Sequence, residues 1–220
     1  MLTEDEEDQL ESGEPADDFN FVAIILAAGS SSRMGTSKQL LEVDGEPLLI
    51  HAINVAVASG AREVVLVLGA NEQSHLDLVK GMPVKVITNH FWKAGMGSSI
   101  KTGLQHIIKE LPESQAVVIM VCDQPAVRSE HIRMLVSTFL ASRKPIAASA
   151  YSQTLGVPVI FARSFFSNIL MLQDDQGAKK IIEQFPDRVA MVDIPEASVD
   201  LDTREDYDRY NLKNKKVISD

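Results

Sequence analysis

Residues 24–38 read Ile-Ile-Leu-Ala-Ala-Gly-Ser-Ser-Ser-Arg-Met-Gly-Thr-Ser-Lys, an apolar run followed at once by a turn of small residues. The run is typical of a buried strand, and Gly29 ends it. Glycine and serine leave backbone N–H groups open to an anion, while Arg33 and Lys38 add fixed positive charge. The stretch therefore predicts a polyphosphate site at the carboxyl end of a strand. Its spacing matches neither G-x-x-x-x-G-K-S/T nor G-x-G-x-x-G, and the alternative interpretation is an ordinary polar turn.

Strand-like and helix-like patterns alternate along the chain beyond this loop. Four Val- and Ile-rich runs are typical of parallel strands that are buried on both faces: residues 21–28, 63–68, 84–88 and 116–121. Helical patterns follow them at residues 47–60, 71–80, 97–110 and 129–141. This order predicts an α/β fold with a mostly parallel sheet and right-handed crossovers.

The carboxyl-terminal part is less regular, and mixed strand directions are expected there. Two strands joined by a short turn are expected at residues 145–151 and 156–161, and a last strand at 188–193. Helices are expected at residues 163–172, 176–185 and 203–211. A length of 220 residues suits one domain, which we place at residues 19–220.

Charge is distributed unevenly along the chain. Residues 1–18 contain nine acidic and no basic residues, which leaves a formal charge of −1 on the rest of a chain whose net charge is −10. The acidic segment has no apolar periodicity, so we expect a disordered tail there, with an acidic interaction arm as the alternative. A nearly neutral body lacks the basic surface that nucleic acid polymers require, so no such partner is expected.

Cysteine content and hydropathy indicate the compartment. Cys122 is the only cysteine, so no internal disulfide can form, as is usual in a reducing environment. No run approaches 18 apolar residues, so no membrane span is expected. The acidic amino terminus lacks the apolar segment of a secretory signal. We therefore expect a cytoplasmic protein.

A second chemical signal lies at residues 117–125, Val-Val-Ile-Met-Val-Cys-Asp-Gln-Pro. This buried strand ends in Asp123, at the same edge of the predicted sheet as Gly29. A carboxylate facing a polyphosphate is repelled unless a cation lies between them, and Mg²⁺ accepts such hard oxygen ligands. The alternative is a carboxylate that caps the next turn.

Two further segments read as the starts of helices. In residues 89–100 a glycine-containing loop leads to a helix near Gly97 and Ser98, whose free N–H groups suit an anion or a carbonyl; Trp92 in this loop is expected to be a packing anchor. In residues 200–206 either Asp202 or Thr203 suits an N-cap.

The run L-A-A-G-x-S-x-R-M-G-x-x-K, from Leu26 to Lys38, resembles the signature of the nucleotidyltransferases with a GT-A-like, Rossmann-type fold. Within them the chain looks most like the molybdenum cofactor nucleotidyltransferases, in particular the cytidylyltransferase branch, over about residues 21–210. The resemblance implies a three-layer α/β/α fold with a mostly parallel sheet and a mixed carboxyl-terminal part.

The resemblance also implies roles for individual residues. The catalytic group would be Arg33, Lys38 and Asp123, and Asp200 would join Asp123 in holding Mg²⁺. The nucleotide would be bound by Ala27, Ala28, Gly29, Ser30, Ser31, Arg33, Lys38, Gly97 and Ser98. The acceptor would be bound by Gly156, Pro158 and Gly177, with a hairpin strand and a helix cap as the alternative interpretation of these segments. Three positions depart from the family pattern, with Cys122 and Asp174 where glycine is usual and Arg204 where proline is frequent.

The implied reaction moves CMP from CTP to the terminal phosphate of molybdenum cofactor and releases pyrophosphate. The partners would be a nucleoside triphosphate, a phosphorylated pterin acceptor and a molybdenum enzyme that receives the product. In this family Ala-Ala-Gly at 27–29 goes with cytidine and Ala-Gly-Gly with guanosine, so CTP is favoured over GTP. The alternatives are a guanylyltransferase, a sugar- or polyol-phosphate nucleotidyltransferase, and a non-catalytic cofactor-binding or insertion protein. A Rossmann oxidoreductase is disfavoured because its glycine fingerprint is absent.

Overall fold

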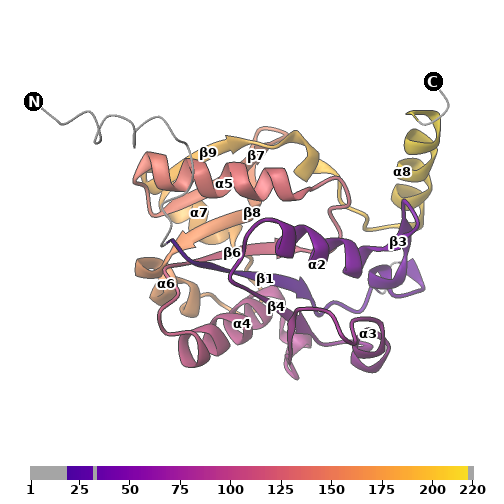
Figure 1. The fold of residues 1–220 in the computed structure, drawn as a ribbon, viewed down its shortest axis with the longest axis horizontal. Helices are drawn as coiled ribbons and strands as arrows, with labels where there is room; N and C mark the ends of the chain where they lie inside the picture. The colour runs from indigo at the N-terminus through magenta and orange to yellow at the C-terminus, as the bar shows by residue number, and fades with distance from the viewer. Residues whose placement is uncertain (1–18, 32–33, 218–220) are drawn as a thin grey trace, which may run out of the picture.

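Seven strands form one sheet in the computed structural model, which describes residues 19–31 and 34–217 (Figure 1). The order across the sheet is β5-β4-β1-β6-β8-β7-β9. The bounds are β1 Phe21–Ala27, β4 Glu63–Leu68, β5 Lys85–Thr88, β6 Ala116–Val121, β7 Ile146–Tyr151, β8 Thr154–Ala162 and β9 Val189–Asp193. Within this sheet β8 alone runs against its neighbours. The predicted α/β fold with a mixed carboxyl-terminal part is therefore confirmed.

Helices cover both faces of the sheet and make the three layers (Figure 1). The helices of one face are α2 Leu48–Ala58 and α5 Ser129–Ser142, and those of the other are α4 Met96–Glu110, α6 Phe166–Leu170 and α7 Lys179–Gln184. The short α3, Glu72–Leu78, follows β4, and α8, Arg204–Val217, lies at the end of the molecule beside β3.

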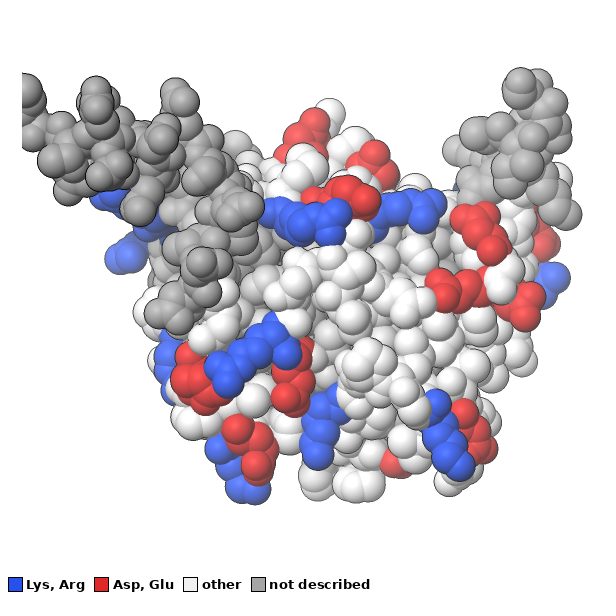
Figure 2. Space-filling model, in the orientation of Figure 1, with Lys and Arg blue, Asp and Glu red and all other residues white. Residues whose placement is uncertain are grey.

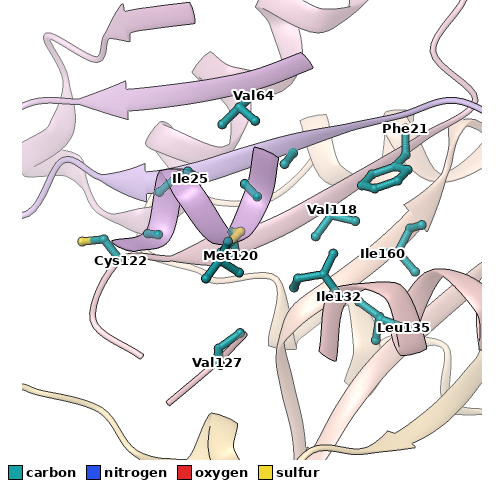
Figure 3. Close-up of a cluster of buried hydrophobic side chains, with 14 of the residues drawn as sticks. Phe21, Ile25, Val64, Val118, Met120, Cys122, Val127, Ile132, Leu135 and Ile160 are labelled. Carbon is teal, nitrogen blue, oxygen red and sulfur yellow. The ribbon is translucent and has the colours of Figure 1, made fainter. Parts of the chain in front are cut away.

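The alternation of side chains along β1 divides the core into two clusters. Phe21 and Ile25 point into the cluster under α2 and α5, which Figure 3 shows. Val22 and Ile24 point into the cluster under α4, α6 and α7. Because both faces of β1 are fully covered, the strand has no polar position, and this central strand places the loop that follows it.

Some local structure differs from the sequence-based expectation. A small hairpin of β2 Glu42–Val43 and β3 Glu46–Pro47 precedes α2, so Pro47 both ends a strand and is the N-cap of the helix. The helix expected at 163–172 is divided into a 3₁₀ turn, Arg163–Phe165, and the short α6. The last helix extends six residues beyond the expected end at 211.

Acidic and basic side chains are interspersed over the face that Figure 2 shows. On that face the described residues form no continuous basic surface. No helix in the described ranges is both long and apolar enough to cross a membrane. The acidic segment 1–18 lies outside the described residues.

Candidate active site

The two strand-end segments that the sequence singled out lie at the same edge of the sheet. β1 and β6 are parallel neighbours, with Leu26 opposite Val121. Gly29 and Asp123 therefore follow their strands side by side. Gly29 and Ser30 are exposed, and Ala28 is buried at the end of the strand. The expected edge is confirmed, while Arg33 lies outside the described residues and its role stays a prediction.

Lys38 lies at this edge and pairs with two carboxylates. Its Nζ forms an ion pair with Oδ2 of Asp123 and lies 3.3 Å from Oδ1 of Asp202. The Lys38 and Asp123 side chains are only 17% and 16% exposed, so solvent screens the pair weakly. Burial by itself lowers the pKa of Lys38, but the two carboxylates outweigh it and raise the pKa above its ordinary value. Lys38 therefore stays protonated.

The segment that carries Asp200 and Asp202 is attached to the strand-end loop by its backbone. Leu201 N–H donates to the Asp123 carbonyl at 3.0 Å. The Leu201 side chain is 1% exposed and packs on Val43 and Leu48 under α8. With Leu201 buried between them, the carboxylates on either side are held near Asp123.

Asp200 and Asp123 lie close enough for their charges to interact. Burial raises the pKa of the Asp200 carboxyl, and the negative charge of Asp123 raises it further. Oδ1 of Asp123 is buried and has no hydrogen-bond partner among the described residues. An unpaired carboxylate oxygen beside a second carboxylate fits a hard divalent cation such as Mg²⁺.

A metal at this place would take only part of its ligands from the protein. In the described part of the chain, no group of three or more His, Cys, Asp or Glu side chains is arranged to hold an ion. Mg²⁺ commonly binds through one or two carboxylates, with phosphate and water completing its shell. The residues therefore suit a metal that arrives with a polyphosphate.

At the start of α8, the residue that caps the helix differs from the residue that faces the carboxylate cluster. Thr203 and Asp206 form a reciprocal pair: Thr203 N–H donates to Oδ2 of Asp206 at 3.0 Å, and Asp206 N–H donates to the Thr203 hydroxyl at 3.2 Å. Of the two expected caps, Thr203 fills the position, and Asp202 faces Lys38 instead. Asp202 therefore lies at the site, although its sequence context indicates only a helix cap.

A cavity of about 350 Å³ lies beside the Gly29 loop. It connects the strand-end segments to the loop before α4. Its lining comprises Leu26, Ala27, Ala28, Gly29, Ser30, Lys38, Gln39, Trp92, Lys93, Gly95, Met96, Ser99, Val121, Cys122 and Asp123. Trp92 therefore lines the cavity, whereas the sequence predicts only a packing role for it.

Gly97 and Ser98 hold a neighbouring loop rather than line this cavity. The Ser98 hydroxyl donates to the Gly95 carbonyl at 2.7 Å and accepts from Asn89 Nδ2 at 2.8 Å. Ser98 N–H donates to the Asp174 carbonyl at 3.3 Å. The loop of residues 173–176 crosses directly over Gly97. Their expected contact with nucleotide stays a prediction, and Gly95, Met96 and Ser99 are the α4-side residues that line the cavity.

We expect Gly97→Ala to destabilise the protein by about 1–3 kcal/mol, because overpacking forces the backbone to move. A Cβ at this position would lie 2.2 Å from the Gln173 carbonyl oxygen and 2.7 Å from that of Gln176. Urea denaturation measures the change. The control is Gln105→Ala on the exposed side of α4, which should stay within about 0.5 kcal/mol of the wild type. Equal midpoints for the two variants would contradict this packing.

The three expected acceptor residues occupy different environments. Gly156 lies against Tyr151, whose hydroxyl oxygen is 2.2 Å from the place where a Cβ would be. Pro158 is buried, and its carbonyl accepts from the Ser149 hydroxyl at 2.7 Å. Gly177 lies beside Met96, a residue of the cavity. Direct contact with an acceptor therefore stays a prediction for all three.

Tyr151 is a half-buried residue that the sequence does not single out. Burial raises the pKa of its phenol, and Asp200 raises it further, so the ring lies near the carboxylate cluster. Tyr151 also lines a second cavity, of about 630 Å³, between the β7–β8 hairpin, α7 and β9. Gln153, Leu155, Lys179 and Met191 are among the other residues of that cavity.

Two residues that depart from the family pattern have well-defined surroundings in the structure. Asp174 accepts from Lys101 Nζ at 2.6 Å, and the same ammonium donates to the Leu172 carbonyl at 2.8 Å. This pair fastens the 173–176 loop to α4. The Cys122 thiol is buried, and burial together with Asp123 raises its pKa to about 12, so it is an inert, protonated side chain.

A sheet with this order, a glycine loop after its first strand and a lysine–carboxylate cluster at the same edge define a nucleotide-binding α/β protein. The model of the MobA-like NTP transferase domain family matches residues 23–189. The chain therefore belongs to this family. It is a nucleotidyltransferase, and its substrate is a nucleoside triphosphate.

Two curated relatives cover most of the chain. Nicotine blue oxidoreductase of Paenarthrobacter nicotinovorans is 29% identical over 195 residues, which are 83% of this chain and 92% of that protein. The purine catabolism protein PucB of Bacillus subtilis is 26% identical over 199 residues, 85% of this chain and 94% of that protein.

Solved structures agree with the fold. Rv0371c of Mycobacterium tuberculosis H37Rv is 26% identical with a TM-score of 0.74, over 88% of this chain and 98% of that one. A structure of Rv0371c in complex with manganese aligns at 23% identity with a TM-score of 0.73, over 88% of this chain and 98% of that one.

Proposed function

We propose that the protein transfers CMP from CTP to the terminal phosphate of a phosphorylated pterin, the molybdenum cofactor, and releases pyrophosphate in a Mg²⁺-dependent reaction. The observation that carries this proposal is the pairing of Lys38 with Asp123 beside the cavity at the Gly29 loop. A cation and carboxylates beside a polyphosphate loop suit phosphoryl chemistry, in which positioning and charge neutralisation supply most of the catalysis.

In the proposed reaction an oxygen of the acceptor phosphate attacks the α-phosphorus of the nucleotide. A new P–O bond forms, the bond to the β-phosphate oxygen breaks, and pyrophosphate leaves with that electron pair. The loop at residues 27–31 would bind the triphosphate through its backbone N–H groups. Lys38, together with Arg33, would neutralise the charge that develops on the phosphate oxygens.

Asp123 and Asp200 are the residues that would hold Mg²⁺. When bound, the ion would supply positive charge between the carboxylates and the triphosphate. Rv0371c has been solved in complex with manganese, which supports a divalent cation in this fold. Tyr151, near Asp200 and at the edge of the larger cavity, is a candidate contact for the acceptor.

The experiment that tests the proposal combines the protein with each of the four nucleoside triphosphates, Mg²⁺ and molybdenum cofactor. Pyrophosphate release and the mass of the product are measured. We expect pyrophosphate and a cytidine dinucleotide of the pterin with CTP. Turnover on a sugar or polyol phosphate, but none on the pterin, would overturn the acceptor assignment. A molybdenum enzyme is the proposed recipient of the product.

A second candidate comes from the printed activity of one relative. Nicotine blue oxidoreductase matches 83% of this chain, so an oxidoreductase on the same fold has a specific observation in its favour. The chain lacks the glycine fingerprint of dinucleotide-binding oxidoreductases. Oxidation of NADH or NADPH in the presence of a quinone-like acceptor dye, without pyrophosphate release from any nucleotide, would favour this candidate.

We expect CTP to exceed GTP in kcat/KM by about tenfold or more, because a small steric difference in a pocket is worth about 1–3 kcal/mol. Ala28 is buried and lines the cavity, where its Cβ narrows the room for a base. Ala28→Gly should reduce the preference. Competition between the two nucleotides with one acceptor measures it, and a wild-type preference for GTP would assign the protein to the guanylyltransferase branch.

A further inference from the structure

Gln39 lies directly beneath the Gly29 loop and is 1% exposed. It belongs to a 3₁₀ turn, Lys38–Leu40. Its Nε2 donates to the carbonyl oxygens of Ala27 and Gly29, at 3.1 Å each. One amide group therefore holds the last residue of β1 and the first turn of the loop at the same time.

The carbonyl oxygen of the Gln39 side chain fastens the other side of the loop. Oε1 accepts from the Ser37 hydroxyl at 2.7 Å and from the Ser31 hydroxyl at 3.1 Å. A glutamine side chain has two donor hydrogens and two acceptor positions. All four form hydrogen bonds here, to residues on both sides of the loop.

Ser31 connects this network to the charged residue of the site. Its hydroxyl oxygen accepts from the Lys38 backbone N–H at 3.1 Å. Ser31 has a φ of 52°, in the left-handed region that a serine rarely adopts. The hydrogen bonds of Ser31 hold that conformation, and they fix the loop relative to Lys38.

His75 of α3 completes the network from outside the loop. It is fully buried, and its Nε2 lies 2.7 Å from the Ser37 hydroxyl oxygen. Because the Ser37 proton is used on Gln39, His75 donates from Nε2. Its Nδ1 has no hydrogen-bond partner among the described residues. Burial lowers the pKa of His75 below its ordinary value, which favours this neutral form.

We propose that Gln39 is the positioning residue of the nucleotide loop, and that His75 acts through Ser37 to hold the Gln39 amide in place. The inference rests on the proposed function, because it assumes that the loop binds the triphosphate. Gln39 sets the directions of the Ala27 and Gly29 peptide groups. The neighbouring N–H groups of the loop are thereby aimed at the phosphates before the nucleotide arrives.

If Gln39 only stabilised the fold, its loss would change the stability of the protein. If Gln39 positions the loop, its loss would also change the affinity for nucleotide. Loss of buried hydrogen bonds destabilises a protein wherever they are, but it leaves the affinity of the folded molecules unchanged. The readout is therefore the Kd for CTP with Mg²⁺, measured by calorimetry at a temperature where thermal unfolding shows every variant to be folded. GTP with Mg²⁺ serves as the second ligand.

The variants separate hydrogen bonding from packing. Gln39→Met keeps the length of the side chain and removes all four hydrogen bonds, and His75→Leu removes the donor to Ser37. Both should raise the Kd for CTP by about tenfold or more, since small misplacements of binding groups have large effects. His75→Gln keeps an N–H near the position of Nε2 and should stay within about threefold of the wild type.

The control is Ser59→Ala, which removes a buried hydroxyl that donates to the Ala56 carbonyl at the end of α2. It should affect stability only. Wild-type affinity for CTP in both Gln39→Met and His75→Leu would overturn the inference, as would equal losses in His75→Leu and His75→Gln. If Gln39→Met does not fold, the two His75 variants decide. Failure of the wild-type protein to bind any nucleotide would instead refute the proposed function.

Discussion

Asp123→Asn is expected to reduce turnover by about a thousandfold or more, because charge stabilisation by a bound metal is worth several kcal/mol and each 1.36 kcal/mol is tenfold in rate. The substitution keeps the size of the side chain and removes the charge that pairs with Lys38. It also removes the charge of the buried Oδ1, which has no hydrogen-bond partner among the described residues. The fold should remain, because the β6 core is apolar.

Three measurements test this prediction: kcat/KM for CTP, the affinity for Mn²⁺ in the presence of CTP, and the unfolding midpoint. The matched control is Asp187→Asn, in the exposed 3₁₀ turn Pro186–Arg188, which should behave as the wild type in all three. Activity of Asp123→Asn within a few-fold of the wild type would remove Asp123 from the metal site. An equal loss in Asp187→Asn would show that the assay reports general damage.

Lys38→Met is expected to change turnover and metal binding in opposite directions. Turnover should fall by about 100- to 1000-fold, as it does when one charge-stabilising group is removed from a site. The affinity for Mn²⁺ without nucleotide should rise by about fivefold, because the ammonium that now pairs with Asp123 and Asp202 is gone. That rise corresponds to about 1 kcal/mol, the upper value for a partly exposed ion pair.

This combination distinguishes a specific role of Lys38 from simple damage to the site, which would weaken both properties. Mn²⁺ titration followed by electron paramagnetic resonance measures the metal affinity, and pyrophosphate release measures turnover. Lys109→Met is the control, because Lys109 is 82% exposed at the end of α4. Weaker Mn²⁺ binding in Lys38→Met would mean that the ammonium does not compete with the metal for Asp123.

The sheet and the edge that carries the site were predictable from sequence for one physical reason. Parallel strands are apolar where both of their faces are buried, so β1, β6 and residues 64–68 of β4 are readable as uninterrupted runs. The carboxyl ends of parallel neighbours meet at one edge, which places Gly29 and Asp123 together without further information.

Local departures from regular structure were less predictable. The β2–β3 hairpin has only two residues in each strand, too few for a periodicity to appear. The division of residues 163–172 into a 3₁₀ turn and α6 depends on packing of Phe165 and Phe166 under the sheet. Such choices depend on tertiary contacts that a pattern of single residues does not contain.

The residues that support the site were not predicted, because nothing in the local sequence around them distinguishes them from ordinary residues. Gln39 directly follows Lys38 and could be suspected from that position, but a glutamine after a lysine is unremarkable by itself. His75 lies 38 positions after Ser37 in the sequence, and only the fold brings the two side chains together. Asp202 is one of two N-cap candidates in the sequence, and Thr203 performs that role with Asp206.

The most direct test of nucleotidyl transfer follows the phosphorus atoms of CTP. The protein is incubated with molybdenum cofactor, Mg²⁺ and CTP that is labelled in either the α- or the γ-phosphate. We expect the α-label in the pterin product and the γ-label in pyrophosphate, in equal amounts. Transfer of the γ-label to the acceptor, or release of the α-label only as free CMP, would contradict it.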